Sequence, residues 1–249
     1  MKILLVSVVL LAAAAAWAQT YSNINDSTAV DTGAAGSVGW GSCVSCAGGG
    51  LNATITSSPF LTTPSVDGSS RDFEINGSAY TDGLWWYKVG PNDSVTHFTF
   101  DFYLWVASNT SAAQALEFDV FQFVSGQEYM FGTQCNYAMG VWDVWNQKTL
   151  KWVPTRTNCT KFTPNTEYHL TFAFHRDSSG NEHYDSLKIV QYNNKRGGVS
   201  KTYSWNLSYP SGPTPAGWTD NMGVQFQMDI GPSGAEMQEW VDEVTLTTS

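Results

Sequence analysis

The sequence predicts an all-β protein, an antiparallel two-sheet β-sandwich of the jelly-roll type. From residue 51 onward, short runs alternate apolar and other residues with a period of two, as half-buried strands do. Clusters of Gly, Asn, Asp, Pro or Ser separate these runs at intervals of roughly ten residues. Beyond the first residues, no stretch shows sustained helical periodicity. A sheet without helices to cover it must pack on a second sheet.

The N-terminus has the features of a secretory signal peptide over residues 1–18. One Lys precedes an unbroken apolar run that ends in small residues at Ala16-Trp17-Ala18. This ending matches an A-x-A-like cleavage site, so the mature chain is predicted to begin at Gln19. The apolar run is too short for a comfortable membrane span. We therefore expect a secreted or periplasmic protein with no membrane span in the mature chain.

The remaining chain suits one large β domain. Residues 19–39 are rich in Ser, Thr, Asn and Gly and predict a flexible entry segment, followed by a single domain over 40–249. The net charge is −10 and Lys and Arg together number 12, which leaves no basic patch to neutralise phosphates. Nucleic acid is thereby excluded as a partner, and a neutral glycan is favoured over an anionic one. We expect a monomer.

Four cysteines in an exported chain predict disulfides. The local pairings Cys43–Cys46 and Cys135–Cys159 need the least rearrangement and are preferred, although four cysteines allow three connectivities. A metal site is the alternative for the C-x-x-C sequence, but no second pair or neighbouring His supports it.

The predicted strands carry one apolar face and one face of hydrogen-bonding groups. In HFTFDFYLWV (97–106), Phe98, Phe100, Phe102 and Leu104 oppose a second set that includes Trp105. The further predicted strands are 73–80, 82–89, 115–123, 127–135, 141–146, 166–176, 185–193, 201–209, 223–230 and 239–246. In 166–176 the apolar set is Tyr168, Leu170, Phe172 and Phe174, and in 223–230 it is Val224, Phe226 and Met228.

The polar faces nearly lack Lys and Arg and carry amides, carboxylates and aromatic side chains instead. In 223–230 this face presents Gln225, Gln227 and Asp229. Sugar rings stack on aromatic planes, and their hydroxyls need planar donors and acceptors. In ALEFDVFQF (115–123) the alternation places Glu117 and Asp119 on one face. These two are either the acid pair of a sugar-cleaving site or acceptors in a site that only binds.

The Glu-x-Asp strand and the closing run WVDEVTL (240–246) resemble the concanavalin A-like jelly-roll superfamily, which includes lectins, laminin G-like modules, endoglucanases and alginate lyases. In layout the chain also resembles secreted bacterial proteins of unassigned function. The resemblance to its laminarinase-like hydrolases implies Glu117 as nucleophile and Asp119 as the carboxylate that tunes it. The general acid of that motif falls at Phe121 or Gln122, and neither can protonate a leaving oxygen.

A hydrolase would thus need its acid from another strand, and Asp229 or Glu236 are the candidates. Lyases of the same superfamily use a Gln-x-His motif and several Arg residues, which this chain does not match. Its histidines, His97, His169, His175 and His183, are interpreted as solvated or hydrogen-bonded strand residues.

Aromatic residues and one aspartate complete the candidate site. Trp85 and Trp86 must split across two faces of a strand. Trp142 and Trp145 lie between Cys135 and Cys159, where a disulfide can hold them as a rigid platform. No cofactor is expected unless calcium binds. Asp242, with Asp26 or Asp31, would fit calcium chemistry, against the alternative that Asp242 bonds backbone amides.

The sequence therefore favours a noncatalytic carbohydrate-binding module that recognises a neutral polysaccharide. In this hypothesis Trp85 or Trp86, Trp105 and Trp142 stack on sugar rings, and Glu117, Asp119, Gln225 and Gln227 bond hydroxyls, with Asp229 beside them. An endo-acting glycoside hydrolase with Glu117 as nucleophile, and an adhesion module that binds protein through its aromatics, are the alternatives.

Overall fold

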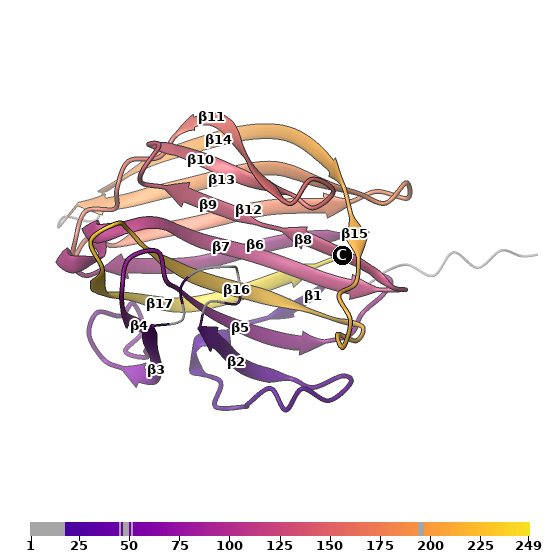
Figure 1. The fold of residues 1–249 in the computed structure, drawn as a ribbon, viewed down its shortest axis with the longest axis horizontal. Helices are drawn as coiled ribbons and strands as arrows, with labels where there is room; N and C mark the ends of the chain where they lie inside the picture. Colours follow the sequence, from indigo (N-terminus) through magenta and orange to yellow (C-terminus); the bar gives the residue numbers. More distant parts are fainter. Residues whose placement is uncertain (1–17, 45, 47–49, 51, 194–196) are drawn as a thin grey trace, which may run out of the picture.

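The computed structural model describes residues 18–44, 46, 50, 52–193 and 197–249, and it is an antiparallel β-sandwich (Figure 1). Residues 1–17 of the predicted signal peptide lie outside the described residues. Within the described part of the chain, no helix is long and apolar enough to cross a membrane.

One layer, which we call the back sheet, is formed by strands that pair antiparallel with their neighbours. From edge to edge its order is β14 (Gly197–Pro210), β13 (Asn181–Asn193), β12 (Tyr168–Arg176), β6 (His97–Val106), β17 (Ala235–Thr248), β4 (Ser70–Gly77) and β3 (Ala53–Leu61). The short strand β1 (Gln19–Tyr21) pairs with β17.

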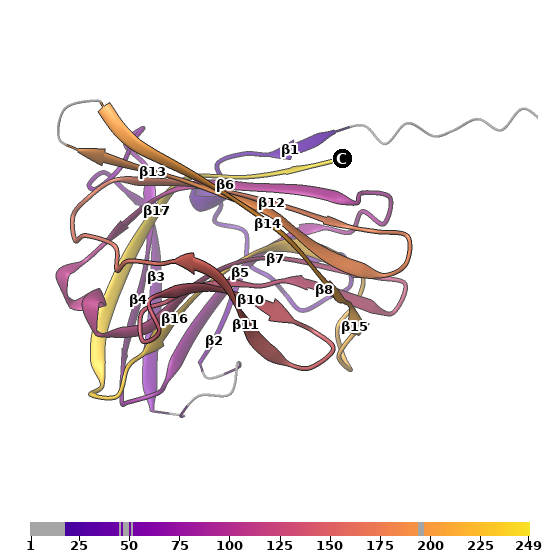
Figure 2. The ribbon, with the colours of Figure 1, turned by 90° about the horizontal axis from the view of Figure 1, so that it is seen from above.

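The other layer is called the front sheet here, and it also pairs antiparallel throughout its described strands. Its order is β11 (Lys151–Asn158), β10 (Val141–Asn146), β9 (Thr133–Asn136), β7 (Ala113–Val124), β16 (Asn221–Ile230), β5 (Asp82–Gly90) and β2 (Gly39–Val44). Strand β8 (Gln127–Phe131) pairs with β7 and with β15 (Gly212–Pro213). Two 3-10 turns, η1 (Ile24–Asp26) and η2 (Ser108–Ala112), lie in connections, and the view in Figure 2 shows the two layers. The predicted fold class is confirmed.

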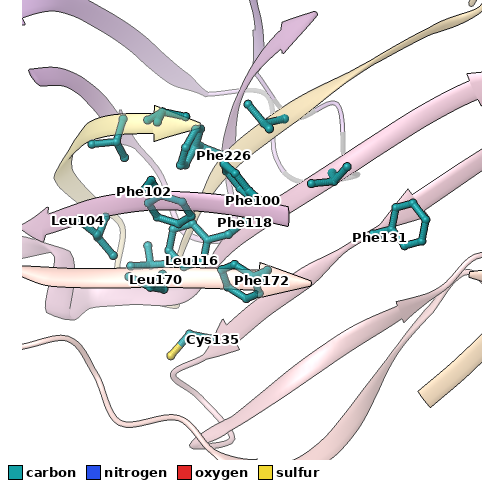
Figure 3. Close-up of a cluster of buried hydrophobic side chains, with 14 of the residues drawn as sticks. Phe100, Phe102, Leu104, Leu116, Phe118, Phe131, Cys135, Leu170, Phe172 and Phe226 are labelled. Atoms are coloured by element: carbon teal, nitrogen blue, oxygen red, sulfur yellow. The ribbon is translucent and has the colours of Figure 1, made fainter. Parts of the chain in front are cut away.

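Aromatic side chains from both sheets fill the space between the layers, as Figure 3 shows. Phe102 of β6 lies with its ring centroid 5.2 Å from Phe118 of β7 and 5.2 Å from Phe226 of β16. Each fully buried Phe contributes about 1.5–3 kcal/mol through removal of apolar surface from water. The inward sets predicted for β6, β12 and β16 are all buried.

Strand alternation then decides what faces solvent. Because successive side chains point to opposite faces, the β7 residues that flank Phe118 project away from the core. These outward residues are Glu117, Asp119, Phe121 and Phe123, and all four line one cleft. The core of the sandwich thus fixes the floor of that cleft.

Both predicted disulfides are confirmed. Cys43 pairs with Cys46 at a Cα–Cα distance of 5.9 Å, and Cys135 pairs with Cys159 at 5.6 Å. The second bond ties β9 to the residue that follows β11, across β10 between them.

The segment 19–39, predicted to be flexible, is instead tied to the back sheet. Gln19 pairs with Thr248, and the buried Asn25 accepts a hydrogen bond from the Val244 amide at 2.9 Å. Arg71 donates from Nε to the Asn25 carbonyl at 2.9 Å. The low apolar content of this segment gave no sign of these contacts, because they are polar and join residues far apart in the sequence.

Candidate functional site

A cleft of about 810 Å³ lies on the outer face of the front sheet. This volume is in the range of ligand-binding pockets in proteins. Strands β5, β7 and β16 form its floor. One end is formed by β10 and β11, and the other end by β2 and the loop that carries Trp218. We refer to it below as the cleft.

Strand register arranges the polar side chains of the cleft floor in rows. Gln227 of β16 is paired with Glu117 of β7, and Gln225 is paired with Asp119. Paired residues on one face of adjacent strands have side chains within contact distance. Each central carboxyl therefore meets an amide from the neighbouring strand.

Hydrogen bonds hold these groups in place. Gln227 Nε2 donates to Glu117 Oε1 at 2.9 Å and to Asp229 Oδ1 at 2.8 Å. Gln225 Nε2 donates to Asp119 Oδ2 at 2.8 Å, and the Thr133 amide donates to Asp119 Oδ1 at 2.8 Å. The sequence-predicted set Glu117, Asp119, Gln225, Gln227 and Asp229 is thus brought together in one site.

Burial makes this centre weakly acidic. Burial raises the pKa of Glu117 well above its usual range, and the nearby charges of Asp229 and Asp119 raise it further. Burial also raises the pKa of Asp119 to about 8, against the lowering effect of its bonds from Thr133 and Gln225. For Asp229, burial raises the pKa to about 6, and a hydrogen bond joins its carboxyl to that of Glu117. The centre therefore retains protons near neutral pH.

Aromatic side chains stand at one end of the cleft. A Cβ added at Gly41 would lie 2.4 Å from the Trp86 ring, so the glycine lets this indole lie close over β2. Trp86 Nε1 donates to Asp31 Oδ2 at 2.9 Å, and Lys88 Nζ lies 2.8 Å from the same carboxylate. Trp218, which is 41% exposed, meets Trp86 edge-on at 6.1 Å.

The opposite end is also aromatic. Trp145 and Trp152 pack edge to face with centroids 5.2 Å apart. Trp145 Nε1 donates to Gln147, whose amide donates to Glu128, and burial raises the pKa of Glu128 to about 7. Trp86 on β5 and Trp145 on β10 are separated by four strand steps, or about 19 Å at ~4.8 Å per step.

Three tryptophans predicted to stack on sugar do not line the cleft. Trp85 faces the core beside Phe73, as the split between Trp85 and Trp86 requires. Trp142 also faces the core, because it lies three residues from Trp145 and the two therefore point to opposite faces of β10. Trp105 lies on β6 of the back sheet. Its side chain points away from the core, on the side of the molecule opposite the cleft.

Asp242 belongs to the back sheet and does not fit a calcium site. Its carboxylate accepts from the Ser65 hydroxyl at 2.7 Å, the Val66 amide at 2.6 Å and the Glu243 amide at 2.8 Å. The Asn25 amide donates to both Asp26 and Asp242, so a donor occupies the position that a shared cation would need. Asp31 is paired with Lys88 instead.

No group of three or more His, Cys, Asp or Glu arranged for a metal ion occurs among the residues that the structure describes.

The histidines lie outside the cleft, on β6, β12 and β13 of the back sheet. His169 contacts Asp101 at 2.7 Å, and His175 contacts Asp185 at 2.9 Å. Their interpretation as hydrogen-bonded strand residues is confirmed. Glu236, one candidate acid, is an exposed residue of β17, whereas Asp229, the other, lies beside Glu117.

Sequence reasoning left four further residues of the cleft outside the candidate set. Trp218 lies in a connection without periodicity, and Trp152 is in β11, a strand that was not predicted. Trp145 and Glu128 lie in predicted strands, but alternation within one strand does not tell which sheet that strand joins. The available signal for Trp218 was its position in the Pro- and Gly-rich run GPTPAGW, because such runs form connections at the surface.

No protein-family model matches the sequence, and no curated protein matches it. Among solved structures, the chain is similar to a carbohydrate-binding module of the β-sandwich superfamily, with 11% identity and a TM-score of 0.40 over 82% of this chain and 55% of that one. It is also similar to lectin I of Ulex europaeus in complex with the methyl glycoside of α-L-fucose, with 12% identity and a TM-score of 0.40 over 93% and 98%. A family 11 carbohydrate-binding module of a cellulosomal cellulase of Clostridium thermocellum gives 12% identity and a TM-score of 0.36 over 84% and 88%.

Proposed function

We propose that this protein is a secreted carbohydrate-binding module that holds a polysaccharide along the cleft without cleaving it. The observation that carries the proposal is the arrangement of Trp86 and Trp218 at one end, Trp145 and Trp152 at the other, and amides with carboxyls between them. A chain of sugar rings needs this alternation, because apolar ring faces stack on indoles and hydroxyls need donors and acceptors.

The lining also favours a ligand without anionic groups, and a neutral polysaccharide is the simplest case. Among the described residues that line the cleft there is no Lys, Arg or His. A uronate or sulfate would meet carboxyls without a compensating cation, at a cost in free energy that hydroxyls do not incur.

The geometry of the carboxyls argues against hydrolysis. Retaining glycosidases keep their two carboxyls about 5 Å apart, and inverting ones keep them further apart. Glu128 is paired with Phe123, six residues along β7 from Glu117, which is about 20 Å at ~3.3 Å per residue. In the motif of the hydrolases, Phe121 takes one acid position and Gln122 faces away from the cleft to bond Arg176.

The glycoside hydrolase is retained as the second candidate because Glu117 and Asp229 are buried carboxyls with raised pKa values, as acid catalysts often are. Electrophoresis of the mature chain through gels that contain β-glucan, xylan or mannan tests binding, and a reducing-end assay on the same polymers tests cleavage. We expect retardation without reducing-end release.

Replacement of an exposed aromatic residue locates the binding surface. We expect Trp218→Ala to weaken retardation at least about tenfold, equivalent to ~1.4 kcal/mol. The matched control is Trp240→Ala, which removes a tryptophan from β17 of the back sheet and should leave retardation unchanged. If the protein releases reducing ends and Glu117→Gln abolishes that release, the hydrolase replaces the binding module as the function. If neither retardation nor release is observed, carbohydrate is rejected as the ligand.

A further inference from the structure

Among the residues that the structure describes, acidic side chains line the cleft and basic ones do not. Its lining includes the carboxyl side chains of Asp82, Glu117, Asp119, Glu128 and Asp229, and no basic side chain among the described lining residues. The whole chain carries a net charge of −10. A net negative charge draws cationic ligands toward the molecule and raises their association rate.

A second observation lies at the centre of the cleft and concerns Gln227. Its side-chain nitrogen donates to both Glu117 and Asp229, which fixes the orientation of the amide. Its oxygen Oε1 has no hydrogen-bond partner, although the residue is only 2% exposed. A buried acceptor without a donor costs about 1–3 kcal/mol. The centre of the cleft therefore has more acceptors than donors.

An ammonium group supplies the missing hydrogen-bond donors better than a hydroxyl does. A hydroxyl brings one donor, whereas a protonated amine brings three donors and a positive charge. In the free protein, protons neutralise part of the charge on Glu117 and Asp229, since burial raises the pKa of both carboxyls. A bound ammonium can replace those protons, because an adjacent positive charge favours the ionised carboxylate.

The aromatic wall of the cleft is compatible with positive charge as well. Lys88 Nζ lies 5.0 Å from the centroid of the Trp218 ring, in the geometry of a cation–π contact. The same ring forms one end of the cleft, and the Lys88 charge beside it is paired with Asp31.

We propose, as a refinement that rests on the proposed function, that the preferred ligand is a polysaccharide with primary ammonium groups. One ammonium of this amino-sugar polymer lies among Gln227, Glu117 and Asp229. The sugar rings of the polymer stack on the tryptophans at the two ends of the cleft.

Isothermal titration with three β-1,4-linked oligomers of equal length tests the refinement: one of glucosamine, one of N-acetylglucosamine and one of glucose. In mildly acidic buffer, where the free amine is protonated, we expect the glucosamine oligomer to bind at least about tenfold more tightly, as a charge-assisted hydrogen bond predicts. Its binding should release protons, which is measured as a dependence of the heat on the ionisation enthalpy of the buffer.

Two variants and two controls locate the effect. Glu117→Gln and Asp229→Asn should each remove most of the preference for the amine and the proton release. Glu236→Gln, an exposed carboxyl of the back sheet, should change neither. Polylysine tests whether charge alone is sufficient, and we expect it not to compete with the glucosamine oligomer at moderate salt.

The outcomes separate the two proposals. Equal or tighter binding of the neutral oligomers, or a preference for the amine that survives both cleft variants, would overturn the ammonium site and leave carbohydrate binding intact. No binding of any of the three oligomers, together with no retardation by the neutral polysaccharides, would reject both proposals.

Discussion

The centre of the cleft and the outer face of the back sheet both carry buried or half-buried carboxyls, yet their electrostatics are opposite. In the cleft, burial outweighs the available hydrogen bonds, and the pKa of Asp119 rises to about 8. On the back sheet, burial also acts to raise the pKa of Asp101, but bonds from His169 and Thr171 outweigh it, so that pKa lies below its usual value. Each of the two carboxyls accepts two hydrogen bonds, so the near-complete burial of Asp119, against the partial exposure of Asp101 and the charge of its neighbour His169, accounts for the opposite directions of the two pKa shifts.

The largest expected effect is the loss of stability on replacement of Asp242 in the back sheet. Asp242→Ala leaves the Ser65 hydroxyl, the Val66 and Glu243 amides and the Asn25 amide without their common acceptor. We expect a loss of about 3–5 kcal/mol in the free energy of unfolding, measured by urea denaturation. Glu117→Gln, a near-isosteric change in the cleft, should cost less than about 1 kcal/mol. Equal costs for the two variants would contradict the contrast between the two faces.

The next effect is the pH dependence of stability that comes from the cleft. A carboxyl whose pKa is raised on folding holds a proton that the unfolded chain releases, so stability is lost as pH rises from the unfolded pKa, near 4, toward the folded one. For Asp119 this window ends at about pH 8. The slope is at most about 1.4 kcal/mol per pH unit for each group. Asp119→Asn should flatten the fall in unfolding free energy measured between these limits, and an unchanged slope would show that Asp119 is ionised in the free protein.

The smallest effect has the opposite sign and comes from the back sheet. Because the pKa of Asp101 is lowered on folding, its contribution to stability is present above the unfolded pKa, near 4, and is lost as pH falls below it. The group is partly exposed, so we expect less than about 1 kcal/mol. Asp101→Asn should lower the unfolding free energy at neutral pH and leave it nearly unchanged in strong acid. A variant that loses as much stability in acid as at neutral pH would indicate a packing effect.

Alternation in the sequence was sufficient to predict the fold class and the two faces of the central strands. It predicted that Phe226 points inward while Gln225 and Gln227 point outward on one strand, and the structure bears this out. It could not assign a strand to a sheet, because the alternation of residues within one strand does not depend on which distant strand it pairs with. Trp105 was for this reason placed in the cleft, although its strand belongs to the back sheet.

Two strands whose sequences lack a regular alternation of large apolar residues escaped prediction. In β3, ATITSSPFL, Ser and Thr occupy most outward positions, and in β11, KWVPTRTN, a Pro interrupts the run. Both are edge strands of their sheets, where fewer side chains are buried and a Pro is tolerated. Trp152 was missed with β11.

Strands β1 and β17 place Gln19 beside Thr248 on the back sheet (Figure 2). The cleft, in contrast, opens on the outer face of the front sheet. A molecule attached to a support at Gln19 or at Thr248 would present its tryptophans outward. Because the two residues are adjacent, a short peptide could join them and the chain could be opened elsewhere, as in a circular permutation. Fusions attached at the back sheet would leave the cleft accessible.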